Sequence, residues 1–222
     1  MQKINLSESC PYNCAFCFNG RKPFVEFSIP DIVDNKVVIC DPAFLSKKNV
    51  LSVIQKLGSK KVNNKVVYYE VLQGINIRDL TPEIAKALKD NRFKPIRFAW
   101  DGSYSKSNMY RVIDAVNMLL EAGYNKKDLI CYILSNYYVS LRECLYKNKF
   151  FLIKNIKVCN CVYRKNYLDP KIYYEHWSKE EVEYYKQECR INNQLVDRKG
   201  YDPEIEKRLI RSKILPQTYK LN

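Results

Sequence analysis

Short apolar runs rich in β-branched and aromatic residues alternate along this chain with longer stretches of helical periodicity. The runs predict strands at residues 3–6, 36–40, 66–72, 95–100, 129–134 and 156–163. Between them, apolar residues at helical spacing predict helices at residues 44–57, 81–88, 108–122 and 141–147. Alternating βα units of this length imply parallel strands joined by right-handed crossovers. The pattern therefore predicts an α/β fold, an open partial barrel of the (βα)6 type.

Local signals define the boundaries of several helices. Thr81 suits an N-cap and is followed by Pro82 in the first turn, while Gly123 ends the helix at 108–122. The interval between the first strand and the strand at 36–40 is short, so we expect an abbreviated first helix.

The pattern changes after Tyr163. Ser178 and Glu181 form a capping-box sequence before a helix of about a dozen residues. A further basic helix is predicted at 203–214. We therefore predict a barrel core at residues 1–163 and a helical C-terminal extension, residues 164–222, that packs on the barrel.

Composition favours an ordinary globular chain in the cytoplasm. The 222 residues are 46% apolar and 28% charged, which suits one compact domain and not a disordered chain. The apolar runs are far shorter than the roughly 20 residues that span a bilayer. The N-terminal segment also lacks the apolar core of a signal peptide. These features predict no membrane association.

The net charge of +14 raises the question of a nucleic-acid partner. The basic residues are dispersed, with only short pairs such as Lys47-Lys48. Solvated surface is therefore the preferred interpretation, and a nucleic-acid substrate stays open.

Three of the 9 cysteines lie close together, as Cys10-x3-Cys14-x2-Cys17, directly after the first predicted strand. Ligands in such sheets bind beyond the carboxyl ends of the strands. Three thiolates can each bind one iron of a [4Fe–4S] cluster, which normally takes four cysteines. The missing ligand would leave one iron open to a small molecule, as catalytic zinc sites keep an open position.

This loop, with the aromatic Phe16 before Cys17, resembles the signature of the radical S-adenosylmethionine (SAM) superfamily. The resemblance implies a radical SAM-type barrel over residues 1–163, with Phe16 among the cofactor-binding residues. It also implies that the open iron binds the amino and carboxylate groups of SAM. An external electron donor of the flavodoxin or ferredoxin type would then drive cleavage of SAM to methionine and a 5′-deoxyadenosyl radical.

Two further segments, 73–78 and 97–101, are similar to radical SAM proteins that often carry a cobalamin domain. Acidic residues common in those proteins are replaced here by Leu72 and Asn76, so a cobalamin role is unsupported. By the same resemblance, we expect four residues at the SAM site. Asp41 would lie near the amino group, Arg78 near the carboxylate, and Gln73 and Asp101 near the ribose hydroxyls. The alternatives are a strand-end turn or cap for the two aspartates and a surface ion pair for Arg78.

Other interpretations of the cysteines are also open. A structural zinc site would need a fourth ligand, but the chain has no second Cys-x2-Cys. Its only histidine is His176, which we expect to be a packing or surface residue. Such a site would make the chain a non-catalytic, metal-stabilised nucleic-acid-binding module. Cys144, Cys159, Cys161 and Cys189 could hold a second cluster, although buried thiols are the preferred interpretation. The sequence identifies no catalytic residue and does not separate a nucleic acid or nucleoside from a protein or peptide as substrate.

Overall fold

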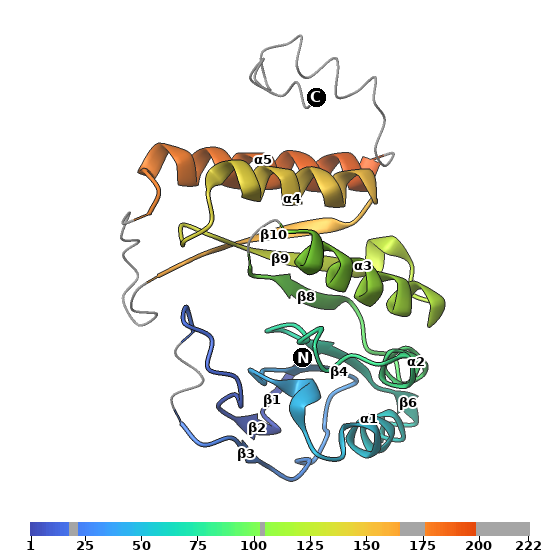
Figure 1. The fold of residues 1–222 in the computed structure, drawn as a ribbon. Helices are drawn as coiled ribbons and strands as arrows, with labels where there is room; N and C mark the ends of the chain where they lie inside the picture. Colours follow the sequence, from blue (N-terminus) through green and yellow to red (C-terminus); the bar gives the residue numbers. More distant parts are fainter. Residues whose placement is uncertain (18–21, 103–104, 165–175, 199–222) are drawn as a thin grey trace.

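Six of the described strands form two parallel sheets, each with three strands. The computed structural model of the chain describes residues 1–17, 22–102, 105–164 and 176–198. One sheet has the order β1-β4-β7, with strands Gln2–Ile4, Lys36–Ile39 and Tyr68–Val71. The other has the order β10-β9-β8, with strands Lys157–Val162, Leu129–Ser135 and Ile96–Trp100. The α/β class and the parallel pairing agree with the prediction (Figure 1).

The two sheets meet between β7 and β8. Lys94 N donates to Tyr69 O at 2.8 Å, and Ile75 N donates to Arg97 O at 2.7 Å. Both contacts belong to isolated parallel bridges, Tyr69–Phe93 and Ile75–Phe98. No closed sheet occurs within the described ranges, so a continuous (βα)6 barrel stays a prediction.

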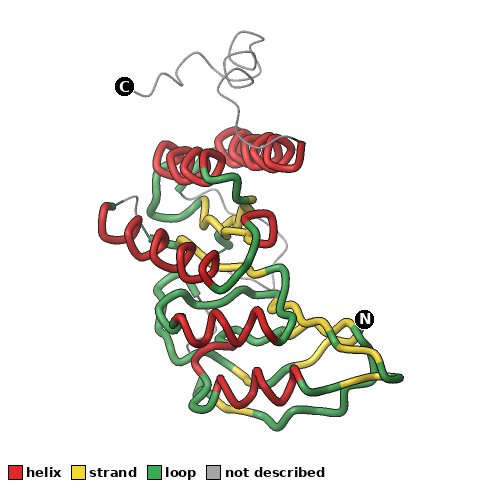
Figure 2. The backbone as a smooth tube through the Cα atoms, turned by 90° about the vertical axis from the view of Figure 1, so that its right-hand side faces the viewer, coloured by secondary structure: helices red, strands yellow, loops and turns green. Residues whose placement is uncertain are grey.

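The helices follow one another along the molecule (Figure 2). In chain order, they are α1 Val50–Gly58, α2 Pro82–Asp90, α3 Lys106–Glu121, α4 Leu141–Ile153 and α5 Lys179–Arg198. Helix α1 contacts α2, and α2 contacts α3. Helices α4 and α5 lie side by side over β9 and β10 (Figure 1).

The predicted caps are present. Thr81 Oγ1 accepts a hydrogen bond from Ile84 N at 3.3 Å, and Gly123 follows α3 with a φ of 95° that suits glycine. Helix α4 is longer than predicted. Its last two turns bury Asn148 and Phe151, so packing extends the helix beyond the residues with a clear helical period.

Two predicted elements were wrong in their boundaries. The predicted helix at 44–57 is divided into a short 3-10 turn, η2 Phe44–Ser46, and α1. The predicted strand at 66–72 starts later, because Lys65–Val66 (β6) pairs with Lys61–Val62 (β5) in a separate hairpin. Asn63 and Asn64 at the tip have φ angles of 50° and 61°, as a tight two-residue hairpin turn requires.

An antiparallel pair of short strands occupies the region where the abbreviated first helix was expected. Ser7–Glu8 (β2) pairs with Val25–Glu26 (β3), on either side of the cysteine loop. Outside residues 18–21, which are not described, the segment between β1 and β4 contains no helix. The loop is therefore closed at its base by strand pairing.

The described part of the predicted extension contains the docked helix α5. Ser178 and Glu181 form the predicted capping box, with Glu181 N donating to Ser178 Oγ at 3.1 Å and Ser178 N donating to Glu181 Oε2 at 2.7 Å. Tyr185 is fully buried, and Trp177 Nε1 donates to Val139 O at 2.8 Å. These contacts fix α5 against the second sheet. The predicted helix at 203–214 lies outside the described residues, and the division into residues 1–163 and 164–222 stays a prediction.

We searched the described helices for a membrane span. None of them is both long and apolar enough to cross a bilayer.

Phe151 on α4 tests the packing of the helices on the second sheet. Its side chain is 0% exposed and lies with its ring centroid 6.0 Å from Phe98 and 5.9 Å from Trp100. We expect Phe151→Ala to lower the free energy of unfolding by about 3–5 kcal/mol, because it leaves a cavity between α4 and β8. The control is Ile153→Ala on the same helix, where the side chain is 52% exposed. Urea denaturation that gives equal losses for both variants would contradict this packing.

Candidate functional site

The three loop cysteines follow β2 along the chain, and their sulfurs lie close enough to act on one another. Cys10, Cys14 and Cys17 are each partly exposed, and among the described residues none forms a disulfide. Cys17 N donates to Cys14 O at 2.9 Å, which folds the last part of the loop into a turn. Burial raises the pKa of the Cys10 and Cys14 thiols, and the nearby sulfur of Cys17 adds to the rise in both.

The donors on this loop, three thiols, are of the kind that binds an iron–sulfur cluster. In the part of the chain that the structure describes, no three His, Cys, Asp or Glu side chains converge on a position that could hold one metal ion. A structural zinc ion needs four ligands around one centre. In a [4Fe–4S] cluster, each cysteine binds a different iron, so the sulfurs need not share a centre. Three neighbouring thiols on one loop therefore fit the cluster.

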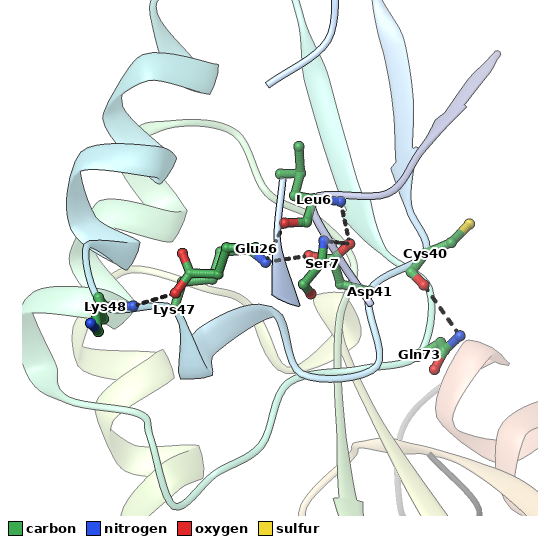
Figure 3. A network of polar contacts seen from close by, with 8 residues as sticks. All are labelled: Leu6, Ser7, Glu26, Cys40, Asp41, Lys47, Lys48 and Gln73. Atoms are coloured by element: carbon green, nitrogen blue, oxygen red, sulfur yellow. Dashed lines mark hydrogen bonds and ion pairs between the residues drawn. The ribbon is translucent and has the colours of Figure 1, made fainter. Parts of the chain in front are cut away.

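A buried ion pair anchors the base of the loop (Figure 3). Asp41, two residues after the end of β4, is 0% exposed, and its Oδ1 accepts hydrogen bonds from Leu6 N at 2.6 Å and Ser7 N at 3.2 Å. Its Oδ2 lies 2.8 Å from Lys47 Nζ, which also donates to Leu6 O at 2.9 Å. The pair thus ties the backbone before the loop to the end of β4.

These contacts bear on the expected role of Asp41. Its carboxylate faces the protein backbone and Lys47. This arrangement agrees with the alternative interpretation of a strand-end turn or cap. A contact with the amino group of SAM would require this pair to open.

A second anchor reaches the middle of the loop. Tyr12 donates a short hydrogen bond to Asp79 Oδ1, and Ser46 Oγ donates to Asp79 Oδ2 at 2.7 Å. The guanidinium of Arg78 lies 5.6 Å from the centre of the Tyr12 ring. Its positive charge opposes the rise in the pKa of Cys14, which places Arg78 beside the cysteines.

Asp101, directly after β8, is another charged group near the loop. Burial raises the pKa of its carboxyl group to about 6, while the charges of Lys147 and Arg78 partly oppose this rise. The charge of Asp101 in turn raises the pKa of Cys14. The fully buried Lys147 holds the strand end, because its Nζ donates to Trp100 O at 3.3 Å and to Gly102 O through a short bond.

The other expected residues lie at different distances from the loop. Phe16 packs edge-on against Tyr137, with ring centroids 5.8 Å apart. Gln73 is exposed, and its Nε2 donates to Cys40 O at 3.3 Å, between the ends of β7 and β4 (Figure 3). The charges of Arg78 and Asp101 thus act on Cys14, whereas Gln73 lies at a neighbouring pair of strand ends. His176 packs on Tyr138, with ring centroids 4.3 Å apart, which confirms it as a packing residue.

The remaining cysteines do not converge on a second metal site within the described ranges. Cys144 and Cys189 are buried, as expected for structural thiols. Cys159 is exposed and Cys161 is partly exposed, so the preferred interpretation of all four as buried thiols was wrong for these two residues.

The sequence did not reveal Lys47 and Asp79 as part of the site. Lys47 and Lys48 form a basic pair that is typical of a solvated surface, yet only Lys48 is exposed. Asp79 follows Arg78 in a turn without any distinctive motif. The Leu6 carbonyl that Lys47 binds and the hydroxyl groups that donate to Asp79 lie far away in sequence, so no local pattern could have indicated their roles.

No family model matches the chain, and no curated protein matches it in sequence. Among solved structures, the crystal structure of HydG, a maturase of the [FeFe]-hydrogenase, is similar to the structure of this chain. The TM-score is 0.55 at 13% identity, and the match covers 86% of this chain and 49% of that chain. The chain thus spans about half the length of HydG. At this identity, the comparison shows a fold similar to that of HydG.

A double-mutant cycle tests the Asp41–Lys47 anchor. We expect Asp41→Ala and Lys47→Met each to lower the free energy of unfolding by about 3–5 kcal/mol, because each leaves the other charge buried without its partner. The double variant should lose clearly less than the sum of the two. The exposed pair Lys86–Asp90 is the control, and its loss should cost under about 1 kcal/mol. Strict additivity at Asp41 and Lys47 would contradict the anchor.

Asp101 gives a prediction with a defined pH range. Its pKa rises from 3.8 to about 6 on folding, so its ionised form destabilises the folded chain. This destabilisation is absent below the unfolded pKa, grows as the pH rises towards 6, and is constant above it. Asp101→Asn should therefore raise the free energy of unfolding by about 1–2 kcal/mol at pH 7, after allowance for partial exposure, with no gain near pH 4.

Chemical denaturation at the two pH values measures this difference, with Asp114→Asn on the exposed surface of α3 as the control. A gain at pH 4 equal to that at pH 7 would show that burial of the charge is not the cause.

Proposed function

We propose that this chain is a radical SAM enzyme in which Cys10, Cys14 and Cys17 hold a [4Fe–4S] cluster. The observation that carries the proposal is a set of three neighbouring thiols on the loop after the first strands of a radical SAM-like fold. With three cysteine ligands, one iron is open to the amino and carboxylate groups of SAM. The bound cluster would supply the electron that cleaves SAM to methionine and a 5′-deoxyadenosyl radical.

The protein would contribute binding, orientation and exclusion of water. Arg78 provides a positive charge beside Cys14, which suits it to the carboxylate of SAM. Asp101, directly after β8, would accept hydrogen bonds from ribose hydroxyls. Phe16 and Gln73 would complete the cofactor-binding residues. We assign Asp41 to positioning, because its carboxylate fixes the backbone before the loop.

The proposed fold is a single (βα)6 partial barrel over residues 1–163, with residues 164–222 packed against it. The parallel bridges between β7 and β8 support this continuation, because they join the two sheets in one order. The barrel would surround the loop with strand ends, and ligands bind at such ends.

We also propose a nucleic acid or nucleoside as substrate, in preference to a protein or peptide. The net charge of +14 supports the attraction of a polyanion. The cluster would receive its electron from a cytoplasmic flavodoxin or ferredoxin.

Anaerobic reconstitution tests the proposed function. We expect the parent chain to bind about four irons, and to release 5′-deoxyadenosine when SAM and dithionite are added. Cys14→Ala should lose both the cluster and the product, because only two loop thiolates remain. Cys40→Ala removes another partly exposed thiol and should retain both.

Product formation in Cys14→Ala would contradict the proposal. One tightly bound zinc per chain, with no iron, would favour the alternative of a metal-stabilised nucleic-acid-binding module.

A further inference from the structure

A group of aromatic side chains lies beside the cysteine loop. Its members come from the loop itself, from the segments after β9 and β10, and from the segment before α5, and we call them the aromatic patch: Phe16, Tyr137, Tyr138, Tyr163 and His176. The ring of Tyr137 is central, because its centroid lies 5.8 Å from that of Phe16, 4.9 Å from Tyr138, 4.7 Å from Tyr163 and 5.8 Å from His176. Since Phe16 directly precedes Cys17, the patch begins at the loop.

The rings of the aromatic patch stay at the molecular surface. Tyr138 is 79% exposed, and the other members are partly exposed. A single exposed ring is ordinary in a folded protein. A contiguous group of exposed apolar side chains, in contrast, is typical of a surface that binds a partner or ligand.

Other aromatic residues dock the C-terminal extension. Trp177 and Tyr185 are both buried, with ring centroids 5.7 Å apart, and the indole of Trp177 donates to Val139 O at 2.8 Å. Buried side chains thus fix α5 to the second sheet. The exposed rings of the aromatic patch are therefore available to a ligand.

A buried asparagine fixes the backbone that carries these rings. Asn136 is 0% exposed, its Nδ2 donates to Tyr163 O at 3.2 Å, and its Oδ1 accepts from Trp177 N at 3.3 Å. Tyr163 N in turn donates to Ser135 O at 2.8 Å. The ends of β9 and β10 and the segment before α5 are thus tied together before any ligand binds. Such preorganisation lowers the entropy that binding costs.

The chemistry of this surface favours a planar ligand with an anionic backbone. Exposed aromatic rings stack on flat faces, and every nucleobase has such a face. The net charge of +14 attracts phosphates, and the exposed Arg164 directly follows Tyr163. Bases within a duplex are already stacked and paired, so an unpaired base suits the surface best.

We propose that the aromatic patch is a stacking surface for an unpaired nucleobase of a nucleic-acid substrate. This inference rests on the proposed function, because it assigns a binding surface to the substrate proposed there. Tyr138, as the most exposed ring, would make the main stacking contact, and Arg164 would bind a neighbouring phosphate. The base would then lie beside the loop that is proposed to hold the iron–sulfur cluster.

Binding of two single-stranded probes to the full, iron-loaded chain tests the need for bases. One probe is a fluorescent oligoadenylate of about ten nucleotides, and the other is an abasic strand of the same length and charge. We expect the oligoadenylate to bind about tenfold more tightly, because the abasic strand has nothing to stack. Equal affinities would show that phosphate attraction alone drives binding, and would overturn the proposal. Tighter binding of an acidic, tyrosine-containing peptide would also overturn it, because the surface would then suit a protein substrate.

Substitution of the most exposed ring locates the binding surface. Tyr138→Ala should weaken oligoadenylate binding about tenfold, with an unchanged salt dependence, because a stacking contact is lost and the phosphate contacts remain. Tyr138→Trp should bind as tightly as the parent. The control is Tyr110→Ala on α3, where the side chain is 57% exposed and binding should not change. Equal effects of the two alanine substitutions would contradict the assignment.

A variant without the cluster separates this inference from the proposed enzyme. Cys14→Ala should release no 5′-deoxyadenosine, yet its binding of oligoadenylate should still depend on Tyr138. A parent chain that makes 5′-deoxyadenosine without Tyr138-dependent binding would overturn the stacking surface and leave the cleavage of SAM standing. Tyr138-dependent binding by a parent chain that makes no product would support the stacking surface and contradict the enzyme.

Discussion

The buried ion pair between Asp41 and Lys47 fixes the backbone from which the cysteine loop departs. One carboxylate oxygen binds the amides of Leu6 and Ser7, while the ammonium binds both the other oxygen and Leu6 O. Two charges removed from water are stable only when such partners surround them. The pair thus holds the end of β1 against the end of β4, and the position of all three loop cysteines depends on it.

The charged groups around the loop come from the carboxyl ends of several strands. Arg78 follows β7, and Asp101 follows β8, yet both act on the thiol of Cys14. Parallel strands make this convergence possible, because their carboxyl ends lie on the same edge of the sheet. Lys147 supports it from the helical layer by binding the carbonyl groups on either side of Asp101. The site therefore combines one local motif with residues that only the fold brings together.

Features governed by short-range chemistry could be predicted from the sequence. The parallel α/β class, the caps at Thr81 and Ser178, and the cluster-like spacing of the cysteines all rest on neighbouring residues. Features governed by contacts between distant segments could not. The contact of Lys47 with Leu6, the pairing of β2 with β3 and the contact of Ser46 with Asp79 depend on partners that are remote in the chain. For the same reason, Cys159 could not be distinguished from a buried thiol before the face of β10 was known.

The central claim is that three cysteines hold a cluster with one open iron. Electron paramagnetic resonance of the reduced, iron-loaded chain, recorded with and without SAM, tests it most directly. The account predicts a [4Fe–4S] signal whose g values shift when SAM is added, because SAM would occupy the fourth position of one iron. A cluster signal that is identical with and without SAM would show that the protein already supplies all the ligands, and would contradict the claim.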